Sequence, residues 1–429
     1  MSDILWSSFN QKERDEYIRF LQIFGALSGL FKDIENGKNA KKPYLYYRNH
    51  EQLYARVFNV EDLTRKDSAF DAVFLGDSHV GIGLKTWFHG SDFSYQKVAE
   101  FNKKSGVDIR PYIENGDFNI AIQKISELRN ERIMFDKRLY QTAQDIYHYV
   151  TRDDYKMNII ETNYDLVQLD QLQLLGVTGS SLSFTDGLNQ YRYSISKSTL
   201  MEEFDASTKQ IITSVPIQLY DDPFELLGNL VLPSYQDKKE YEEIYLPLYS
   251  DVDGKVQEKS GLNASLASSK VAGSNKPRPE YEAYIGIPSW IHRVFPEFFG
   301  VDLKESTKVH VDLVLHLPDG TKMKAIVSQS NGKSLQTNPQ NVLGKWILKG
   351  VFDLKPYQRL TLEMLERFGV DSVRIIKLSK HEYKIDFASF GAFEKWKYSQ
   401  RELIITQYER DNKTWRLPKF RLDSDLEDE

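Results

Sequence analysis

The sequence contains no cysteine among its 429 residues, which excludes disulfide bonds and thiolate metal sites. The eight histidines show no ligand-like clustering, so structural zinc is not expected. There is no apolar run long enough to cross a bilayer, and the first residues lack the basic and apolar regions of a signal peptide. We therefore expect a soluble, cytoplasmic protein with no membrane partner.

An overall excess of positive charge, which would favour a nucleic-acid partner, is also missing, since the formal net charge is −6. The charge is unevenly distributed, however. Residues 281–422 carry 23 Lys and Arg against 16 Asp and Glu, whereas residues 423–429 hold five acids and the first 280 residues are acidic overall. A basic C-terminal region favours contact with phosphates. Ordinary surface charge would account equally well for the acidity of the N-terminal region.

The length of the chain predicts two or three domains, each with its own core. Residues 251–280 are rich in Ser, Gly, Lys and Asn and contain no aromatic residue, which is typical of a linker. We therefore predict a first domain at 1–250, a linker at 251–280, a second domain at 281–422 and an acidic tail at 423–429.

Hydrophobic periodicity predicts an α/β arrangement for the first domain. Helices are expected at residues 13–32, 50–58, 95–103 and 118–150. Buried strands are expected at 70–75 and 80–84, joined by a turn at Gly76, Asp77 and Ser78. Residues 181–204 alternate like a hairpin around Asp186 and Gly187 and then show a helical pattern from Ser198.

The most informative segment is residues 68–103, because it holds an acid, a lysine and a second acid in the order that a metal-dependent nuclease needs. Two strands pairing across the turn would bring Asp71 and Lys85 towards the same end of a sheet, although 14 positions separate them. This layout resembles the core of the PD-(D/E)XK nucleases. The resemblance implies a restriction-endonuclease-like mixed sheet flanked by helices.

The segment departs from the family pattern at one position. The family usually has an acid two residues before the lysine, whereas this chain has Gly83 there. In some members the helix that follows supplies the acid, which implies Glu100, and an upstream helix often adds a glutamate, which implies Glu51. On this basis Asp71 and Glu100 would hold Mg²⁺, Lys85 would serve the attacking water, and Glu51 would add a ligand or a supporting hydrogen bond.

The same residues also fit purely structural roles. Asp71 would then be a turn former at a strand end, Lys85 a solvated strand terminus, and Glu100 an exposed helix residue. The stretch 76–86 superficially resembles a phosphate-binding loop, but Leu84 occupies the place where that loop requires glycine. Nucleotide binding is therefore not expected here.

The second domain shows short β-branched strands separated by turns at residues 318–320, 331–332 and 369, which predicts an all-β barrel. Residues 287–387, and 343–348 most of all, resemble the pseudobarrel recognition domain that plant B-three-type transcription factors share with restriction enzymes of the EcoRII, BfiI and NgoFVII type. The resemblance implies that two segments grip the major groove of DNA. The matching positions here are Arg293, Gln329, Asn331, Lys333 and Gln336.

Some enzymes with this recognition domain cut with a phospholipase D-like nuclease, but its His-x-Lys signature does not occur in this chain. The two resemblances together imply a Type II-like restriction endonuclease that uses Mg²⁺ and acts on double-stranded DNA. They also imply a homodimer as one arrangement, and a cognate DNA methyltransferase as a genetic rather than a bound partner. Two alternatives stay open: a nuclease that cuts only modified DNA, and a non-catalytic DNA-binding protein with a degenerate nuclease fold.

Overall fold

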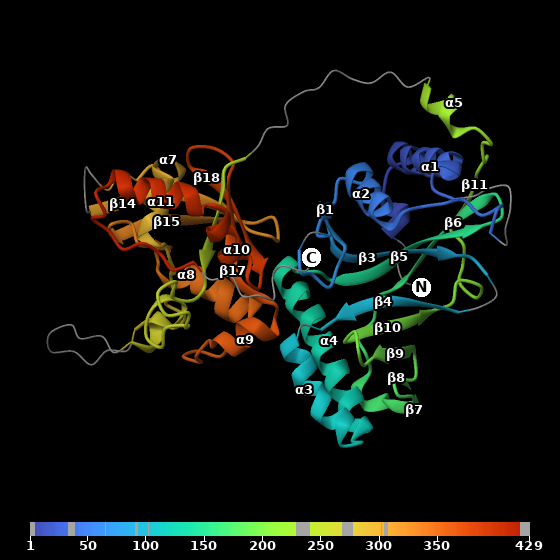
Figure 1. The fold of residues 1–429 in the computed structure, drawn as a ribbon, viewed down its shortest axis with the longest axis horizontal. Coiled ribbons are helices and arrows are strands. Elements are labelled where there is room, and N and C mark those ends of the chain that lie inside the picture. Colours follow the sequence, from blue (N-terminus) through green and yellow to red (C-terminus); the bar gives the residue numbers. More distant parts are fainter. Residues whose placement is uncertain are drawn as a thin grey trace. The chain divides into compact units, whose positions relative to one another are not determined.

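The computed structural model describes residues 5–32, 39–64, 66–90, 93–101, 103–228, 241–267, 278–301, 303 and 308–420. The chain divides into two compact units, Met1–Gln236 and Asp237–Glu429 (Figure 1). The predicted acidic tail at 423–429 lies outside the described residues.

The division between the units lies earlier in the chain than the linker predicted at 251–280. Strand β12 (Glu243–Pro247) pairs with β17 (Val370–Lys377), so it belongs to the C-terminal unit. The short 3₁₀ helix η4 (Gly261–Leu266) belongs there too, because the Asn263 side chain donates to the Leu360 carbonyl and accepts from its amide, both at 2.9 Å. The stretch without aromatic residues is therefore, as far as residue 267, a folded part of the C-terminal unit.

The N-terminal unit is built on a six-stranded mixed sheet. Its strand order is β1-β2-β3-β5-β6-β11, with β3 and β5 parallel and the other neighbours antiparallel. The strands are β1 (Glu61–Asp62), β2 (Ala72–Leu75), β3 (His79–Phe88), β5 (Gln144–Asp153), β6 (Lys156–Asn163) and β11 (Thr213–Pro216). The predicted strand pair around the turn at residues 76–78 is confirmed, and β3 continues well past Lys85.

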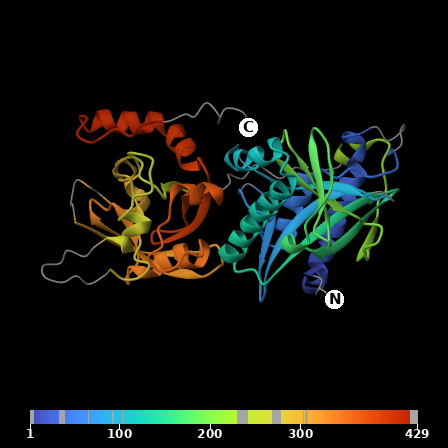
Figure 2. The ribbon, with the colours of Figure 1, turned by 90° about the horizontal axis from the view of Figure 1, so that it is seen from below.

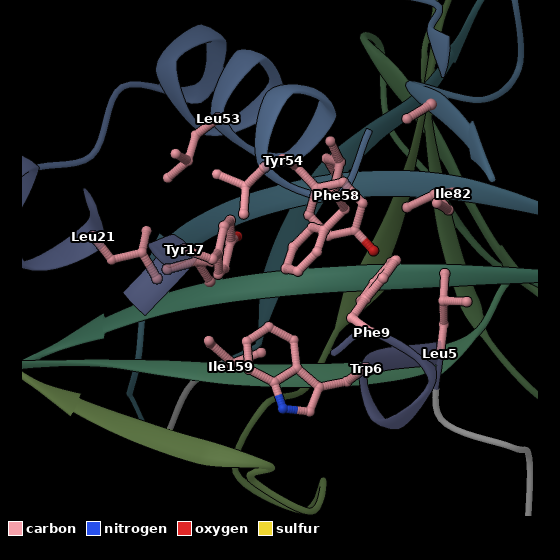
Figure 3. Packing of buried hydrophobic residues seen from close by; sticks show 14 of the residues in the cluster. Leu5, Trp6, Phe9, Tyr17, Leu21, Leu53, Tyr54, Phe58, Ile82 and Ile159 are labelled. Atoms are coloured by element: carbon pink, nitrogen blue, oxygen red, sulfur yellow. The ribbon is translucent and has the colours of Figure 1, made fainter. Parts of the chain in front are cut away.

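Two helices, α1 (Gln11–Ala26) and α2 (Tyr47–Val57), cover one face of this sheet (Figure 1). The short 3₁₀ turn η1 (Leu5–Ser8) precedes α1, and η2 (Leu27–Leu30) follows it. Apolar residues at helical spacing face the sheet, as the sequence predicts. Tyr17, Leu53, Tyr54 and Phe58 pack there with residues of β3, β5 and β6 (Figure 3).

A second, five-stranded antiparallel sheet has the order β4-β10-β9-β8-β7. Its strands are β4 (Ser94–Glu100), β7 (Gln173–Val177), β8 (Ser181–Thr185), β9 (Gln190–Ser194) and β10 (Thr199–Phe204). Helices α3 (Lys103–Glu114) and α4 (Phe118–Tyr140) share its core. Phe204 packs against Trp87, Tyr147 and Tyr149 of β3 and β5, so this sheet meets the six-stranded sheet on the face away from α1 and α2.

Three secondary-structure predictions in this unit are wrong. The helix predicted at 95–103 is strand β4, and the helix predicted from Ser198 is strand β10. These two segments pair with each other although about a hundred residues of sequence separate them. Local periodicity cannot reveal such a contact. The helical stretch predicted at 118–150 ends at Tyr140, and residues 144–153 form β5. The hairpin around Asp186 and Gly187 is confirmed as β8 and β9.

The C-terminal unit contains one seven-stranded sheet, with the order β12-β17-β18-β14-β15-β16-β13. The strands after β12 are β13 (Ile285–Gly286), β14 (Lys308–His316), β15 (Lys322–Ser330), β16 (Ser334–Gln336), β17 and β18 (Glu382–Ser389). The two edge strands β12 and β13 contact each other, which nearly closes the sheet into a barrel. The predicted turns at 318–320 and 331–332 join β14 to β15 and β15 to β16.

Short helices surround this barrel-like sheet (Figure 2). They are α6 (Ser289–Val294), α7 (Pro296–Phe299), α8 (Asn341–Gly344), the π-helix η5 (Lys345–Val351), α9 (Leu362–Arg367), α10 (Ala392–Ser399) and α11 (Arg401–Arg410). Taken over both units, the chain is thus mixed α/β, and its C-terminal unit contains a barrel-like sheet. Within the described ranges, none of the helices is long and apolar enough to cross a membrane.

Candidate active site and nucleic-acid interface

Asp71 and Lys85 are brought together by the pairing of β2 with β3. Asp71 immediately precedes β2, and its amide donates to the Ile82 carbonyl at 2.9 Å, which extends the ladder by one residue. Its Oδ2 accepts the Leu84 amide at 2.7 Å and the Lys85 ammonium at 3.3 Å. The two side chains are 27% and 18% exposed. The structure therefore brings the two residues together, as the sequence predicts, although β3 continues beyond Lys85 as far as Phe88.

Glu51 lies in the second turn of α2, close enough for its charge to be coupled to both of these residues. Burial and the neighbouring Asp71 carboxylate raise the pKa of Glu51 to about 7, while Lys85 lowers it by a smaller amount. Two carboxylates that repel each other in a half-buried place keep a proton more tightly than exposed ones do. Glu51, Asp71 and Lys85 therefore form one electrostatic cluster from three different elements, which we call the acid–lysine cluster.

The absence of an acid at Gly83 has a packing explanation. A Cβ atom added at Gly83 would stand 2.6 Å from two ring carbons of Tyr147 and 3.2 Å from the ring of Tyr164. These two rings stack on each other with their centroids 4.1 Å apart. The space that the family acid would occupy is filled by aromatic side chains, so glycine is required for this close approach.

Glu100 does not join the acid–lysine cluster, contrary to the sequence prediction. It ends strand β4 rather than lying on a helix, and its backbone is paired with Thr199 of β10. Its side chain is 59% exposed and forms an ion pair with Lys97 at 2.7 Å. This exposure agrees with the alternative interpretation of Glu100 as an exposed surface residue, although Glu100 lies on a strand and not on a helix.

A further acid near the cluster was missed by sequence reasoning. Glu202, buried on β10, accepts from the Arg129 guanidinium at 3.0 Å and lies 3.5 Å from the Tyr147 hydroxyl. Burial raises its pKa to about 7, and Lys85 is among the charges that act on it. The alternation of Leu200, Glu202 and Phe204 on one side of β10 was the available signal, but the segment was interpreted as a helix.

The acid–lysine cluster fits a divalent cation only in a particular way. Among the described residues no group of three or more His, Asp or Glu stands together as a metal cage. Mg²⁺, however, commonly binds through one or two carboxylates and keeps waters and substrate phosphates as its other ligands. Burial and, after it, the charge of Asp71 raise the pKa of Glu51, so a cation held by both carboxylates would offset their repulsion.

In the C-terminal unit, the turn between β15 and β16 presents polar side chains on an unusual backbone. Gln329 and Asn331 have φ angles of 69° and 61°, in the left-handed region. Asn331 and Lys333 are exposed, and Gln329 is half-buried. His292 of α6 is buried and neutral, because burial lowers its pKa, and its Nε2 donates to the Gly332 carbonyl at 2.8 Å. This bond joins α6 to the turn. The sequence predicts that these two segments face DNA.

The C-terminal unit matches a known family of DNA-binding domains. Residues 235–379 match the family model of the NgoFVII C-terminal B3-like DNA-binding domain. No curated protein matches the chain. The match begins just before β12 and ends after β17, which agrees with the unit boundary at Gln236 and includes the stretch that the sequence assigned to a linker. The predicted recognition domain is thereby supported as a B3-like domain.

Within the B3-like domain the five predicted contact residues are placed differently. Asn331 and Lys333 are accessible, whereas Gln336 is buried in β16 and its Nε2 donates to Ser328 Oγ at 2.7 Å. The Arg293 guanidinium lies 3.6 Å from Asp411 and over the ring of Trp415. Contact with DNA by Gln336 or Arg293 would therefore require these side chains to leave their present partners. It remains a prediction for all five.

Proposed function

We propose that this protein is a Mg²⁺-dependent endonuclease of a restriction system, with the acid–lysine cluster as its cutting site and the B3-like domain as its DNA-binding module. The observation that carries the proposal is the meeting of Asp71 and Lys85, 3.3 Å apart at one end of a mixed sheet, with Glu51 coupled to both. A mixed sheet that has helices α1 and α2 on one face and carries such a cluster supports the PD-(D/E)XK resemblance.

The residues of the cluster have distinct roles in this proposal. Asp71 and Glu51 would hold Mg²⁺, which on binding lowers the pKa of a coordinated water and offsets charge on the phosphate. The Lys85 ammonium has three protons, and the bond to Asp71 uses one of them. The others orient the attacking water and stabilise the negative charge that develops on the phosphate oxygens. Asp71 fixes the lysine and is itself fixed by the Leu84 amide.

The B3-like domain supplies affinity for the duplex. Its exposed Asn331 and Lys333 can contact base edges or phosphates from a turn whose backbone is held by His292. The domain would read either the cleavage target or an effector copy of it.

A second candidate function is DNA binding without cleavage. The tight packing of Tyr147 and Tyr164 over Gly83 is its best support, because it leaves the cluster with one carboxylate fewer than the family normally has. In this case the N-terminal unit would serve packing or dimerisation alone.

The deciding experiment is cleavage of unmethylated phage DNA by the purified protein with Mg²⁺, beside the Lys85→Ala variant. We expect discrete fragments from the wild type and at least about a 10²-fold lower rate from the variant, the scale of a lost acid–base group. Both proteins should retard the same DNA in a binding assay. Cleavage of methylated DNA alone would indicate a modification-dependent nuclease, and binding without any Mg²⁺-dependent product would overturn the proposal.

A further inference from the structure

A chain of buried polar groups crosses the core between α1, α2 and the six-stranded sheet. The Tyr17 hydroxyl lies 2.8 Å from His50 Nε2 and 3.1 Å from His148 Nε2. His148 Nδ1 lies 3.1 Å from Glu161 Oε1, and Glu161 Oε2 accepts the Trp6 amide at 3.0 Å. The Tyr17, His50 and His148 side chains and the Glu161 carboxylate are at most 2% exposed. We call these four residues the buried relay.

The hydrogen bonds of the buried relay form one consistent set when Glu161 is ionised and His148 is neutral. The Glu161 carboxylate then only accepts, so His148 Nδ1 donates to it and His148 Nε2 is an acceptor. The Tyr17 hydroxyl then donates to His148 Nε2, and its oxygen accepts from His50 Nε2. Each donor therefore has one acceptor, which makes the relay a defined structure.

The buried relay ends beside the acid–lysine cluster. His50 directly precedes Glu51 on α2 and is the first buried residue of that helix. No side chain caps the N-terminus of α2, and the bond from His50 to Tyr17 is a buried polar contact between the first turns of α2 and helix α1. At the other end, His148 on β5 is paired with Leu84 of β3, the residue before Lys85. The relay thus ties the helix that carries Glu51 to the strands that carry Lys85.

We propose that the buried relay positions Glu51 for cation binding, with Tyr17 as its central positioning residue. The inference rests on the proposed function, since it assigns Glu51 to the cation. No member of the relay touches the reacting atoms; each acts through the place of α2. If the hydroxyl of Tyr17 is removed, two histidine nitrogens lose their partner and α2 loses its fixed end, so Glu51 should hold a cation less well.

Tyr54 provides a matched control. It lies on α2, is fully buried, and its ring contacts that of Tyr17 (Figure 3). The Tyr54 ring also contacts His148. Its hydroxyl has no hydrogen-bond partner among the described residues. Tyr54→Phe therefore removes a buried hydroxyl from the same core without cutting the relay, whereas Tyr17→Phe makes the same chemical change and cuts it.

The test is the Mg²⁺ concentration needed for half-maximal cleavage, measured well below the melting temperature of each protein. We expect Tyr17→Phe to raise it about 10-fold or more with an unchanged KM for DNA, and Tyr54→Phe to leave it within about twofold. A second pair guards against misfolding: His50→Gln keeps a donor near Tyr17 and should retain the wild-type requirement, while His50→Leu should not. Equal Mg²⁺ requirements for Tyr17→Phe and Tyr54→Phe would overturn the inference and leave the proposed function intact.

Binding of Mn²⁺ without DNA separates the two proposals further. We expect the wild type and Tyr54→Phe to bind Mn²⁺ alike, and Tyr17→Phe to bind it about 10-fold more weakly. If this difference appears while the wild type cuts no DNA, the positioning role stands and the nuclease proposal fails. If the wild type does not bind Mn²⁺ at all, the cation site and its positioning by the relay are both overturned.

Discussion

The two units of the chain hold their candidate functional groups in opposite ways. In the N-terminal unit Glu51, Asp71 and Lys85 converge from a helix and two strands into one half-buried cluster, and the environment raises the pKa of Glu51. In the B3-like domain Asn331 and Lys333 stand exposed on a single turn whose backbone is held by His292. Chemistry needs side chains that alter one another, whereas recognition needs accessible side chains on a fixed backbone.

This contrast has a direct functional consequence. A substitution in the acid–lysine cluster should change the rate of cutting and leave DNA affinity alone. A substitution on the exposed turn should change affinity and its salt dependence and leave the chemistry alone. Any variant that changes both would show that the two units are coupled.

The largest effect in this comparison is expected from Glu51→Gln. The amide keeps the shape of the side chain but cannot provide a charged oxygen for Mg²⁺, so we expect cleavage to fall about 100-fold at pH 8. At limiting Mg²⁺, wild-type cleavage should rise with pH through about 7, because the cation binds the ionised carboxylate and free Glu51 loses its proton over this range. This rise should be absent from the residual activity of the variant. Rates measured from pH 5.5 to 8.5 would decide. A pH profile identical in both proteins would exclude Glu51 from the site.

The raised pKa of Glu51 also predicts that the stability of the fold depends on pH. The folded-state pKa of Glu51 is about 7, above its ordinary value of 4.5, so the folded chain binds this proton more tightly than the unfolded chain does. The resulting stabilisation is fully present below pH 4.5 and is lost as the pH rises through about 7. Glu51→Gln should therefore raise the melting temperature at pH 8 more than at pH 5. Equal shifts at both values would contradict the raised pKa.

A smaller effect is expected from Lys333→Ala in the B3-like domain. Removing one exposed phosphate contact should weaken DNA binding by about 3- to 10-fold at moderate salt and reduce the salt slope by about 1. Gln336→Ala is the control, because its amide is buried against Ser328 and its loss should cost about 1 kcal/mol of stability without changing the salt slope. Titrations at several salt concentrations would separate these results. A larger change in slope for Gln336→Ala than for Lys333→Ala would reverse the assignment.

The sequence predicts the parts of this molecule that depend on short stretches of chain. Asp71 and Lys85 were paired correctly because one turn joins their strands. The fold of the B3-like domain could be anticipated from the resemblance of residues 287–387 to pseudobarrel domains, together with their short strands and turns, and the family match supports it. The face on which α1 and α2 bury their apolar residues also follows from local periodicity.

What the sequence does not reveal depends on contacts between distant segments. Residues 94–100 and 199–204 lie in segments predicted to be helical, but they pair with each other as strands. This pairing places Glu202 in the core. Gln336 was chosen for its chemistry, but β16 is buried along its whole length. The ring of Tyr147 over Gly83 explains the missing acid only once the parallel pairing of β3 with β5 is known.

The smallest effect is expected from Glu100→Ala. The Glu100 carboxylate is exposed and paired with Lys97 on the same strand, so its removal should change stability by at most about 0.5 kcal/mol. Because Asp71 takes its contacts from Leu84 and Lys85, the Mg²⁺ requirement and cleavage rate should stay within about twofold of wild type. A loss of cleavage comparable with that of Glu51→Gln would show that β4 moves on binding DNA and delivers Glu100 to the cluster. An unchanged rate would leave Glu51 and Asp71 as the cluster's carboxylates.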